Sequence, residues 1–592
     1  MSRVFGCTGR AAMFAAASGD RPHAAVNADI APLFVHAECD TGTEAFVDDA
    51  NGSVYLSGDT LPAAQLGALR NPKAALEALC GLAGAFLFVG ADKHSGEALL
   101  AIDRSGIRNL YYAEVTGGLV FGTSAGEVAA HPMVGAEIDP QSLFHYAYFH
   151  MIPGPRTIFG KVRRLVPGEY LHWTPQGMTL GRYWEINYDE SRSEPFEALK
   201  QEFMSVFEQS VAACIPSGKG GAFLSGGTDS SSIAGMLCKV TGAGFDTYSI
   251  GFAADGFDEM EYARIASKHF GTRHHEYYVT PDDIVRAVPL LAASHEQPFG
   301  NSSAIPAYYC AQMAKADGVS GLIGGDGGDE IFGGNARYAK QRVFSLYESL
   351  PGALRSSLIE PLALRLPQAV PPLRKVRSYV EQASTPMPDR ADSYNVLRRF
   401  GFDTVFAHDF LAAVDTEEPL AIQAAWYNNP SAHSLINRML AMDMKFTLAD
   451  NDLPKVTTSC AMAGLPVAYP LLDDRMVAFS CKLAPQLKLK GTKLRWFFKE
   501  ALKDFLPPQI ISKSKHGFGL PFGQWALGHG PLKALAFDSI ASLKQRGLFD
   551  NDFLDRLPAL NEAHPNYYGN FVWVLMMLEQ WFQHHATAAR SA

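Results

Sequence analysis

The pattern of hydrophobic and polar positions changes about a third of the way along the chain. Up to residue 185, short apolar runs alternate with turn residues at close spacing. These runs cover residues 45–47, 54–56, 84–89, 98–102, 110–112 and 118–122. Short runs separated by turns are typical of antiparallel strands. We therefore predict a β-rich domain over residues 1–185.

From about residue 195 the pattern becomes an alternation of helices and strands. Periodicity predicts helices over 195–213, 230–240 and 258–270, and strands over 221–224, 246–252 and 274–279. Such alternation predicts a parallel sheet flanked by helices. The remainder is expected to be mostly helical, and no element is assigned to the proline-rich stretch 351–387. A chain of 592 residues is long enough for two domains, so a second domain is predicted over 195–585.

Composition narrows the class of protein. Hydrophobic residues make up 47% and charged residues 19% of the chain, which is typical of a globular protein. The net charge is −10 without a long basic block, so no nucleic-acid partner is expected. No stretch approaches the roughly 20 apolar residues of a membrane span, so no membrane partner is expected. The eight scattered cysteines are typical of a reducing compartment and predict a cytoplasmic protein.

A glycine-rich loop follows the first strand of the alternating region and carries the clearest chemical signal. Its residues are Ser225, Gly226, Gly227, Thr228, Asp229 and Ser230. Two glycines let the backbone approach an anion closely, and a helix start directly after them favours negative charge. The hydroxyls add donors, and a carboxylate beside phosphates fits a bound Mg²⁺. We interpret the loop as a pyrophosphate cradle.

Residues 324–330 form a second glycine-rich loop with three carboxylates. By itself this loop fits a solvated acidic turn equally well. Carboxylates from two separate loops can hold Mg²⁺ between them, so Asp229 favours a functional role for the second loop.

The first loop resembles the signature of enzymes that cleave ATP between its α and β phosphates. Further matches extend the resemblance over most of the chain to the asparagine synthetase family. They lie at residues 103–112, 154–159, 165–169, 323–334, 453–456, 470–473 and 515–521. The resemblance implies an α+β glutaminase-like, Ntn-hydrolase-like domain followed by an α/β synthetase domain. It also implies ATP and Mg²⁺ as the nucleotide and the metal.

The resemblance assigns roles to individual positions. The metal is implied between Asp229 and Asp329, with Gly325 beside the nucleotide. Asp326 matches a family carboxylate near the site of acyl transfer, which is normally Glu. Lys515 is implied over the α-phosphate and the tetrahedral intermediate, where a positive donor stabilises charge that develops during the reaction. Lys493 matches a family lysine that contacts phosphate, although a lysine that solvates a helix start fits equally well.

The chain departs from the family pattern in two places. Ser2 occupies the position of the nucleophilic cysteine of the family's glutaminases, and serine is a far weaker nucleophile near neutral pH. The N-terminal domain is therefore expected to lack glutaminase activity. Pro466 and Ala468 stand where the family has Glu and Arg. Without these charges, the acceptor pocket is expected to be more apolar and a poorer site for a small zwitterion.

These departures favour a ligase whose amine belongs to the substrate. Lasso peptide cyclases, which join the N-terminal amine of a peptide to an Asp or Glu side chain, are the favoured class, and β-lactam synthetases are similar. An asparagine synthetase remains the alternative. The substrate is expected to be a peptide or a small-molecule carboxylate, and a cyclase would work with a leader peptidase and a precursor-peptide-binding protein.

Overall fold

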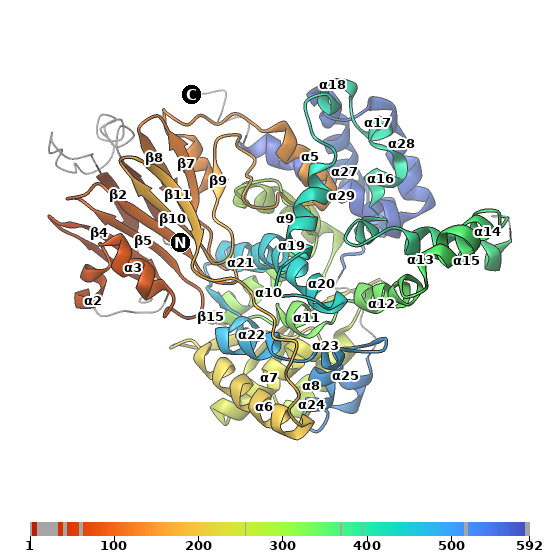
Figure 1. The fold of residues 1–592 in the computed structure, drawn as a ribbon, viewed down its shortest axis with the longest axis horizontal. Coiled ribbons are helices and arrows are strands. Elements are labelled where there is room, and N and C mark those ends of the chain that lie inside the picture. Colours follow the sequence, from red (N-terminus) through yellow and green to blue (C-terminus); the bar gives the residue numbers. More distant parts are fainter. Residues whose placement is uncertain are drawn as a thin grey trace.

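In the computed structural model of the protein, the described residues are 3–8, 33–38, 44–58, 63–254, 256–367, 370–393, 395–513 and 519–585. A β-rich N-terminal part lies beside a larger part that is built from helices around a parallel sheet (Figure 1). This arrangement confirms the predicted fold class of both parts. No helix among these residues is long and apolar enough to cross a bilayer.

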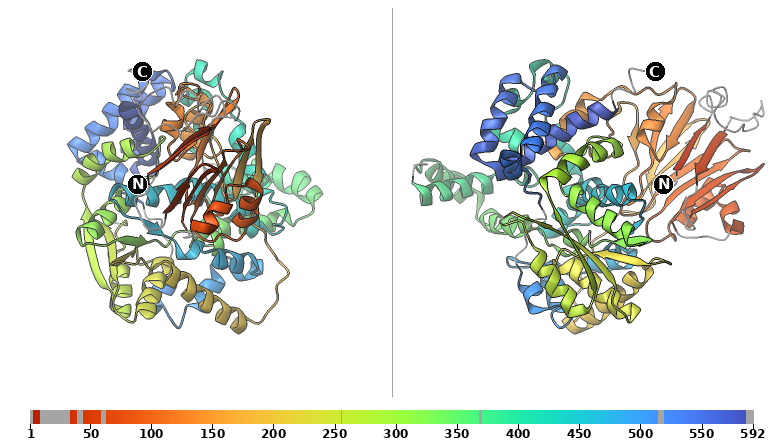
Figure 2. Two further views of the ribbon diagram at one scale, coloured as in Figure 1. Left: turned by 90° about the vertical axis from the view of Figure 1, so that its left-hand side faces the viewer. Right: turned by 180° about the vertical axis from the view of Figure 1, so that it is seen from behind.

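Two antiparallel sheets form the N-terminal part (Figure 2). Their strands are β1 (Arg3–Thr8), β2 (Leu33–Glu38), β3 (Glu44–Asp48), β4 (Gly52–Ser57), β5 (Leu87–Asp92), β6 (Ala98–Ile102), β7 (Tyr111–Val115), β8 (Gly118–Gly122), β9 (Arg163–Arg164), β10 (Glu169–Thr174) and β11 (Gly177–Arg182). The orders are β2-β1-β8-β7-β9 and β11-β10-β6-β5-β4-β3. The six predicted strands are therefore confirmed, although β5 begins three residues later than expected.

Apolar side chains hold these sheets together in layers. One buried cluster contains residues of both sheets, among them Val89 and Phe121. A second cluster packs two helices onto the six-stranded sheet, with Leu66 and Leu79 against Phe88. These helices are α2 (Ala63–Ala68) and α3 (Pro72–Leu79), and α4 (Ala125–Ala129) and α5 (Pro140–Phe149) follow the last long strand of the first sheet.

The second part contains a five-stranded sheet in which every neighbouring pair is parallel. Its strands are β12 (Gly220–Phe223), β13 (Asp246–Phe252), β14 (Arg273–Val279), β15 (Gly321–Ile323) and β16 (Val467–Ala468), in the order β14-β13-β12-β15-β16. The first helices are α6 (Phe196–Ala213), α7 (Thr228–Thr241), α8 (Met260–Phe270), α9 (Pro281–Ser294) and α10 (Ala304–Ala316). The six elements predicted between 195 and 279 are confirmed within two residues at each end.

Helices make up most of the remaining chain, as the sequence predicted. Between the sheet strands β15 and β16 lie α11 (Gly328–Phe332), α12 (Ala336–Glu348), α13 (Gly352–Leu354), η1 (Arg355–Ile359), α14 (Glu360–Leu364), α15 (Pro371–Ser384), η2 (Asp389–Asp392), α16 (Val396–Phe400), α17 (Phe402–Val405), α18 (His408–Leu411), α19 (Glu418–Tyr427), α20 (Leu435–Asp443), the π-helix η3 (Met444–Asp452) and α21 (Leu453–Met462). After β16 follow η4 (Pro470–Leu472), α22 (Asp474–Cys481), α23 (Pro485–Lys488), the hairpin β17 (Leu489–Lys490) and β18 (Lys493–Leu494), α24 (Trp496–Ala501), α25 (Pro508–Ser512), α26 (Phe522–Gly528), α27 (Gly530–Leu543), η5 (Lys544–Arg546), α28 (Asn551–Ala563) and α29 (Pro565–His585). The unassigned proline-rich stretch thus forms α13 to α15, which project from the body (Figure 1).

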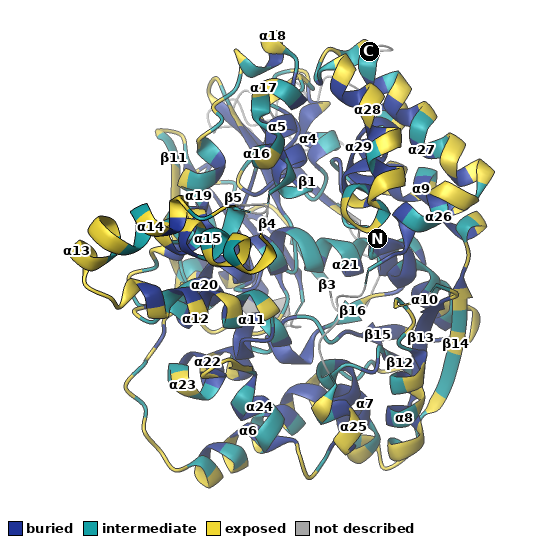
Figure 3. Cartoon of the chain, turned by 90° about the vertical axis from the view of Figure 1, so that its right-hand side faces the viewer, coloured by how far each residue is buried: buried dark blue, intermediate teal, exposed yellow. Residues whose placement is uncertain are grey.

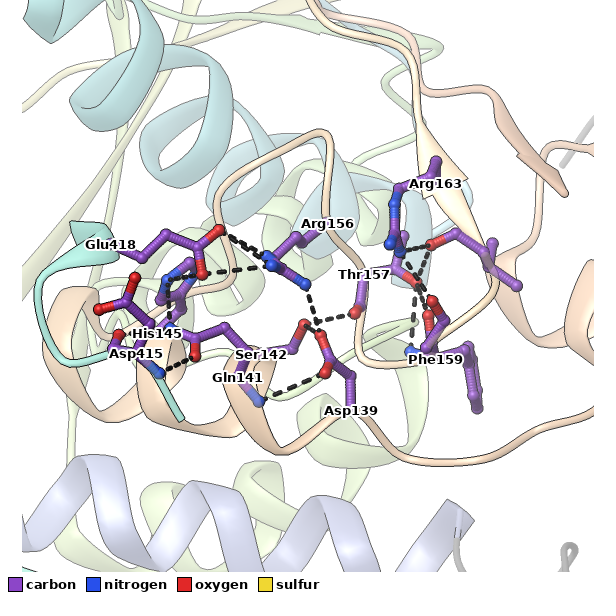
Figure 4. Close-up of polar contacts among 12 residues, drawn as sticks. Asp139, Gln141, Ser142, His145, Arg156, Thr157, Phe159, Arg163, Asp415 and Glu418 are labelled. Atoms are coloured by element: carbon purple, nitrogen blue, oxygen red, sulfur yellow. Dashed lines mark hydrogen bonds and ion pairs between the residues drawn. The ribbon is translucent and has the colours of Figure 1, made fainter. Parts of the chain in front are cut away.

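A polar network fixes α5 of the N-terminal part against the segment that leads into α19 (Figure 4). Arg156 pairs with Asp139 at 3.0 Å and with Glu418 at 2.9 Å. Gln141 donates to the carbonyl of Asp415 at 2.9 Å. Buried polar groups need such partners, so the network specifies how the two parts dock.

A second contact between the parts is ionic and buried. Arg164 lies 2.5 Å from Asp450 of the π-helix η3, and Lys445 also contacts this carboxylate. Burial lowers the pKa of Lys445 to about 8. Two residues beyond Asp450, Asp452 lines a cavity of the second part. The π-helix therefore connects the N-terminal part to that cavity.

Candidate active site

The loop after β12 forms one wall of this cavity. Gly226 has a φ of +70°, and a Cβ there would lie 2.5 Å from the backbone nitrogen of Ala263, so only glycine fits without a shift. The hydroxyls of Ser225 and Ser230 lie 3.0 Å apart across the loop. Gly227 is the N-cap of the 14-residue helix α7, and no side chain caps this helix end. Free N–H groups at the start of α7 can therefore receive an anion.

The loop after β15 lies directly against the first loop. Both follow the carboxyl ends of neighbouring parallel strands, which is where ligands of open α/β sheets bind. A Cβ on Gly325 would lie 3.2 Å from the backbone nitrogen of Ser230, and one on Gly328 would overlap the carboxylate of Asp229. Glycine at these two positions allows the acidic loop to approach the cradle, so the structure brings together the two sets of residues predicted from the sequence.

Arg495 joins the two carboxylates that were expected to hold the metal. Its Nη1 donates to Asp229 Oδ1 at 2.6 Å and to Thr228 Oγ1 at 2.8 Å, and its Nη2 contacts Asp329. The arginine has a φ of +52° and is only 5% exposed. Asp229 and Asp329 therefore converge on one cationic group. Arg495 was not singled out from the sequence, although Lys493, two residues before it, was.

The donor set at this point fits Mg²⁺. The ion is usually held by one or two carboxylates together with substrate phosphates and water, and Asp229 and Asp329 provide two hard oxygen ligands from separate loops. The described residues contain no group of three or more His, Cys, Asp or Glu side chains suited to a metal. Two carboxylates would leave the coordination of the ion incomplete, so substrate phosphate and water would have to complete it.

A buried ion-pair cluster lies in the same cavity, with Lys455 between Asp326 and Asp452. Lys455 Nζ is 2.9 Å from Asp452 and 3.4 Å from Asp326. Burial raises the pKa of Asp326 above its usual value, while Lys455 lowers it in part. Burial opposes the charge on Lys455, but Asp452 and Asp326 outweigh it and raise the pKa of the lysine. Lys455 therefore keeps its charge and orients Asp326.

Glu330 adds a second buried acid to the cavity wall. Burial raises the pKa of Glu330 well above its usual value, and the Asp452 and Asp443 carboxylates raise it further. A neutral carboxylic acid can donate a hydrogen bond as well as accept one. The sequence analysis counted Glu330 only as one of the acidic side chains of the loop.

Two further lysines line the cavity. Lys513 Nζ lies 3.0 Å from Glu259 and 3.4 Å from the Gly226 carbonyl, at the edge of the cradle. Lys499 donates to the Ile511 carbonyl at 2.9 Å, and burial followed by Arg495 lowers its pKa. Neither lysine was singled out from the sequence, because isolated lysines resemble surface residues.

The structure describes only one of the two lysines that were singled out from the sequence, Lys493 and Lys515. Lys493 lies on the short strand β18 at the wall of the cavity, and its side chain is exposed. Its contact with phosphate stays a prediction. Lys515 lies outside the described residues, as does Ser2.

The cavity has a volume of about 1000 Å³, and a second cavity of about 650 Å³ adjoins it. Thr447 lines both cavities, and Arg337 of the second one donates to its hydroxyl at 2.9 Å. The apolar lining of the second cavity includes Tyr148, Phe149, Phe257, Phe446, Phe522 and Trp573. Its wall thus combines the end of α5 from the N-terminal part with helices of the second part.

Comparison with known families agrees with this arrangement of two loops on a parallel sheet. The sequence model described as asparagine synthase matches residues 202–583. The chain belongs to the asparagine synthase family. The model described as a glutamine amidotransferase domain matches residues 73–184. Asparagine synthetases are ATP-dependent ligases, so this member of the family is an ATP-dependent carbon–nitrogen ligase.

Curated relatives show the same family at low identity. The chain is 24% identical to asparagine synthetase (glutamine-hydrolyzing) 1 of Bacillus subtilis, over 76% of this chain and 70% of that protein. It is 24% identical to asparagine synthetase (glutamine-hydrolyzing) 3 of the same organism, over 73% and 67%. A fungal protein named amidase chyE, from Penicillium rubens, is 22% identical over 77% and 72%.

The segment of this asparagine synthase family member that carries Pro466 and Ala468 lies beside the acidic loop. Ala468 pairs with Ile323 in the sheet, and its carbonyl accepts a hydrogen bond from Gly324 at 2.9 Å. Pro466 is exposed and Ala468 half-buried. A charged side chain at 468 would therefore lie at the start of the loop that carries Asp326, and alanine leaves that place apolar.

Proposed function

We propose that this ligase activates a peptide carboxylate with ATP and closes a macrolactam, as lasso peptide cyclases do. The observation that carries the proposal is the second cavity, which shares Thr447 with the nucleotide cavity and is lined by aromatic side chains. A small amino acid does not need this space. A peptide whose carboxylate reaches the nucleotide cavity can place its apolar side chains there.

In the first proposed step, a substrate carboxylate oxygen attacks the α-phosphorus of ATP, and the bond to the β-phosphate oxygen breaks. The cradle at 225–230 binds the phosphates through backbone N–H groups and the start of α7. Mg²⁺ held by Asp229 and Asp329 would supply charge neutralisation that makes pyrophosphate a better leaving group. Arg495 lies on both carboxylates and can move its guanidinium onto a phosphate oxygen when the metal binds.

In the second step, an amine nitrogen of the same peptide attacks the acyl carbon, the amide bond forms, and AMP leaves with the acyl oxygen. The nitrogen loses a proton in this step. Asp326 is the acceptor that we assign, and Lys455 holds its carboxylate in position. We also assign Lys515 to the developing charge, on the basis of the family resemblance.

The proposal implies partners and a location. A freshly exposed N-terminal amine requires a leader peptidase, and recognition of the precursor requires a peptide-binding protein. We propose no nucleic-acid partner. Seven cysteines of the described chain are free thiols, which fits the cytoplasm.

The decisive experiment incubates the purified enzyme with ATP, Mg²⁺ and a leader-free core peptide. We expect AMP, pyrophosphate and a product lighter than the linear peptide by one water, with no effect of ammonium or glutamine. Formation of ADP and phosphate would overturn the nucleotide chemistry. Robust synthesis of asparagine from aspartate and ammonium would favour the asparagine synthetase alternative, which the names of the curated relatives suggest.

Two variants separate the cavities. Val396→Trp fills part of the second cavity, which Val396 lines, and should abolish peptide turnover while ATP still binds. Asp329→Asn should instead abolish the release of pyrophosphate with any acceptor.

Ser2→Ala should leave ligation intact, because the N-terminal part is proposed to be structural. If the parent protein released glutamate from glutamine and Ser2→Ala did not, that structural role would be contradicted.

A further inference from the structure

The helical arm formed by α12 to α15 has a surface that the ligase chemistry does not use. It projects from the body of the molecule (Figure 1). A small core of its own holds the arm together, in which Phe344 and Tyr347 pack against Val380 and Ala383. The arm therefore has a packed inner side and an outer side that faces away from this core.

The outer side of the arm is unusually apolar. Among the described residues, nine of the fourteen large hydrophobic side chains with high exposure lie on the arm. Exposed residues are frequent along α13 to α15 (Figure 3). These are Val343, Leu346, Leu350, Leu354, Leu358, Leu362, Leu364, Val370 and Val376. Five of the leucines recur at every fourth position from 346 to 362, and Leu346 is 60% exposed. A group of exposed apolar side chains on one projecting element indicates an interaction site.

The charge of the arm is opposite to that of the chain. Residues 336–384 contain eight Lys or Arg and three Glu, a net charge of +5, whereas the whole chain has −10. Each of the three glutamates is engaged. Glu348 pairs with Arg390 at 2.7 Å and Glu381 with Arg377 at 2.7 Å, while Glu360 accepts a hydrogen bond from Tyr347 at 3.2 Å.

Several basic side chains of the arm, by contrast, have no ionic partner. Arg342, Arg365, Arg374 and Lys375 are exposed, and none of them forms an ion pair with another described residue. The outer surface therefore combines aliphatic side chains with unpaired positive charge. Such a surface is complementary to a partner that has an anionic outer layer and an apolar interior beneath that layer.

We propose that the arm docks on the surface of an anionic lipid bilayer, with its leucines among the acyl chains and its basic side chains at the headgroups. The exposed side chains are aliphatic, whereas the aromatic residues of the arm, such as Phe344 and Tyr347, point into its core. Protein hot spots are enriched in Trp, Tyr and Arg and poor in Leu and Val. The apolar residues are also spread along α12, α13, η1, α14 and α15, which suits a fluid phase better than a groove.

This docking differs from a membrane span and is compatible with the absence of a spanning helix from the described chain. It also goes beyond the proposed reaction and does not depend on it. The root of the arm lies at the active site, since Asn335 lines the nucleotide cavity and Arg337 the second cavity. Docking would therefore hold the site close to the bilayer, where an apolar substrate or product partitions.

The test is flotation of the full-length protein with vesicles of phosphatidylcholine alone or mixed in equal parts with phosphatidylglycerol. We expect binding to the anionic vesicles only, weakened by salt. Leu358→Glu with Leu362→Glu should abolish it, and Arg374→Glu with Lys375→Glu should weaken it by roughly tenfold or more.

A matched pair controls for charge added elsewhere. Leu180 and Leu290 are 43% and 49% exposed and lie outside the arm, so Leu180→Glu with Leu290→Glu should float like the parent protein. Thermal unfolding and pyrophosphate release show that each variant is folded. Failure of the parent protein to bind anionic vesicles at low salt would overturn the proposal, and so would unchanged binding of the leucine variant. A specific complex with an acidic protein in place of lipid binding would likewise overturn it.

Discussion

Arg495 and Asp229 lie 266 residues apart in the chain and are joined by a hydrogen bond of 2.6 Å between Nη1 and Oδ1. The same guanidinium contacts Asp329. One cation thus neutralises two carboxylates that come from two different loops. Without it, like charges would face each other in a partly buried site.

Replacement of Arg495 should leave the repulsion between Asp229 and Asp329 uncompensated. Arg495→Met should lower the free energy of unfolding by about 1.5–3 kcal/mol, because charged hydrogen-bond partners lose their donor. Added Mg²⁺ should restore part of the stability, since the ion can take the place of the guanidinium between Asp229 and Asp329. Thermal unfolding with and without Mg²⁺ measures both effects.

The control is an arginine–aspartate pair in which the arginine is exposed. Arg475 lies 2.7 Å from Asp473 and is 47% exposed, so Arg475→Met should change stability by no more than about 1 kcal/mol. It should also show no dependence on Mg²⁺. Equal losses in the two variants would contradict the assignment of Asp229 and Asp329 to the metal.

A single added methyl group at Gly226 should weaken nucleotide binding by the loop 225–230. At Gly226, a Cβ would meet the backbone of Ala263 at 2.5 Å, so Gly226→Ala must displace the loop. We expect the Kd for an ATP analogue to rise by about tenfold or more, because the N–H groups of the loop would no longer converge on phosphate. Isothermal titration calorimetry with a non-hydrolysable analogue provides the measurement.

Gly242 is the matched position at the other end of α7. It has a φ of +66°, and a Cβ there meets nothing within 4 Å. Gly242→Ala therefore adds similar backbone strain without a collision, and nucleotide affinity should be retained. Comparable loss of affinity in both variants would show that the effect is general destabilisation.

Lys455 should set the acidic limit of activity. Burial raises the pKa of Asp326, and Lys455 counteracts part of that rise. If Asp326 accepts the amine proton, it must be ionised, so turnover should fall as the pH drops through its pKa. In Lys455→Met this pKa rises, and the acidic limb of the pH profile of kcat should move to higher pH. Lys455→Arg keeps the charge and should move it less; identical limbs in all three proteins would reject Asp326 as the acceptor.

His145 should make the docking of the two parts sensitive to acid. It is 1% exposed, and burial followed by the charge of Arg156 lowers its pKa to about 4, although Glu418 lies 3.6 Å away. The unfolded chain has the usual value of 6.5 and takes up the proton first. The stability that neutral His145 contributes is therefore present in full above pH 6.5. It is lost as the pH falls toward 4, by about 2 kcal/mol at roughly pH 5.

Thermal unfolding across this pH range tests the linkage. His145→Gln should reduce the slope between pH 6.5 and 4 without removing it, because burial also lowers the pKa of His150 to about 4 and that of His295 to about 3. His408 is 98% exposed, so His408→Gln should follow the parent protein. An unchanged slope in His145→Gln would show that other groups control acid stability.

The sequence by itself determined the elements around the cradle. Strands and helices between 195 and 279 were predicted within two residues at each end, because each is governed by local periodicity and by turn residues nearby. The same holds for the glycines and hydroxyls of 225–230, whose chemistry lies in six consecutive residues. Family resemblance then connected the loop at 324–330 to this cradle.

Only the tertiary structure decided which distant side chains meet. Arg495 reaches Asp229, and Lys455 reaches Asp326 across 129 residues. Neither residue was assigned a role from the sequence, although Lys455 lies in the matched stretch 453–456. The arm could not be predicted either, because no element was assigned to the proline-rich stretch that forms α13 to α15. Which of its leucines are exposed depends on which face of each helix packs against the others. Periodicity records short-range preference, whereas these contacts arise when sheet order and helix docking bring remote segments together.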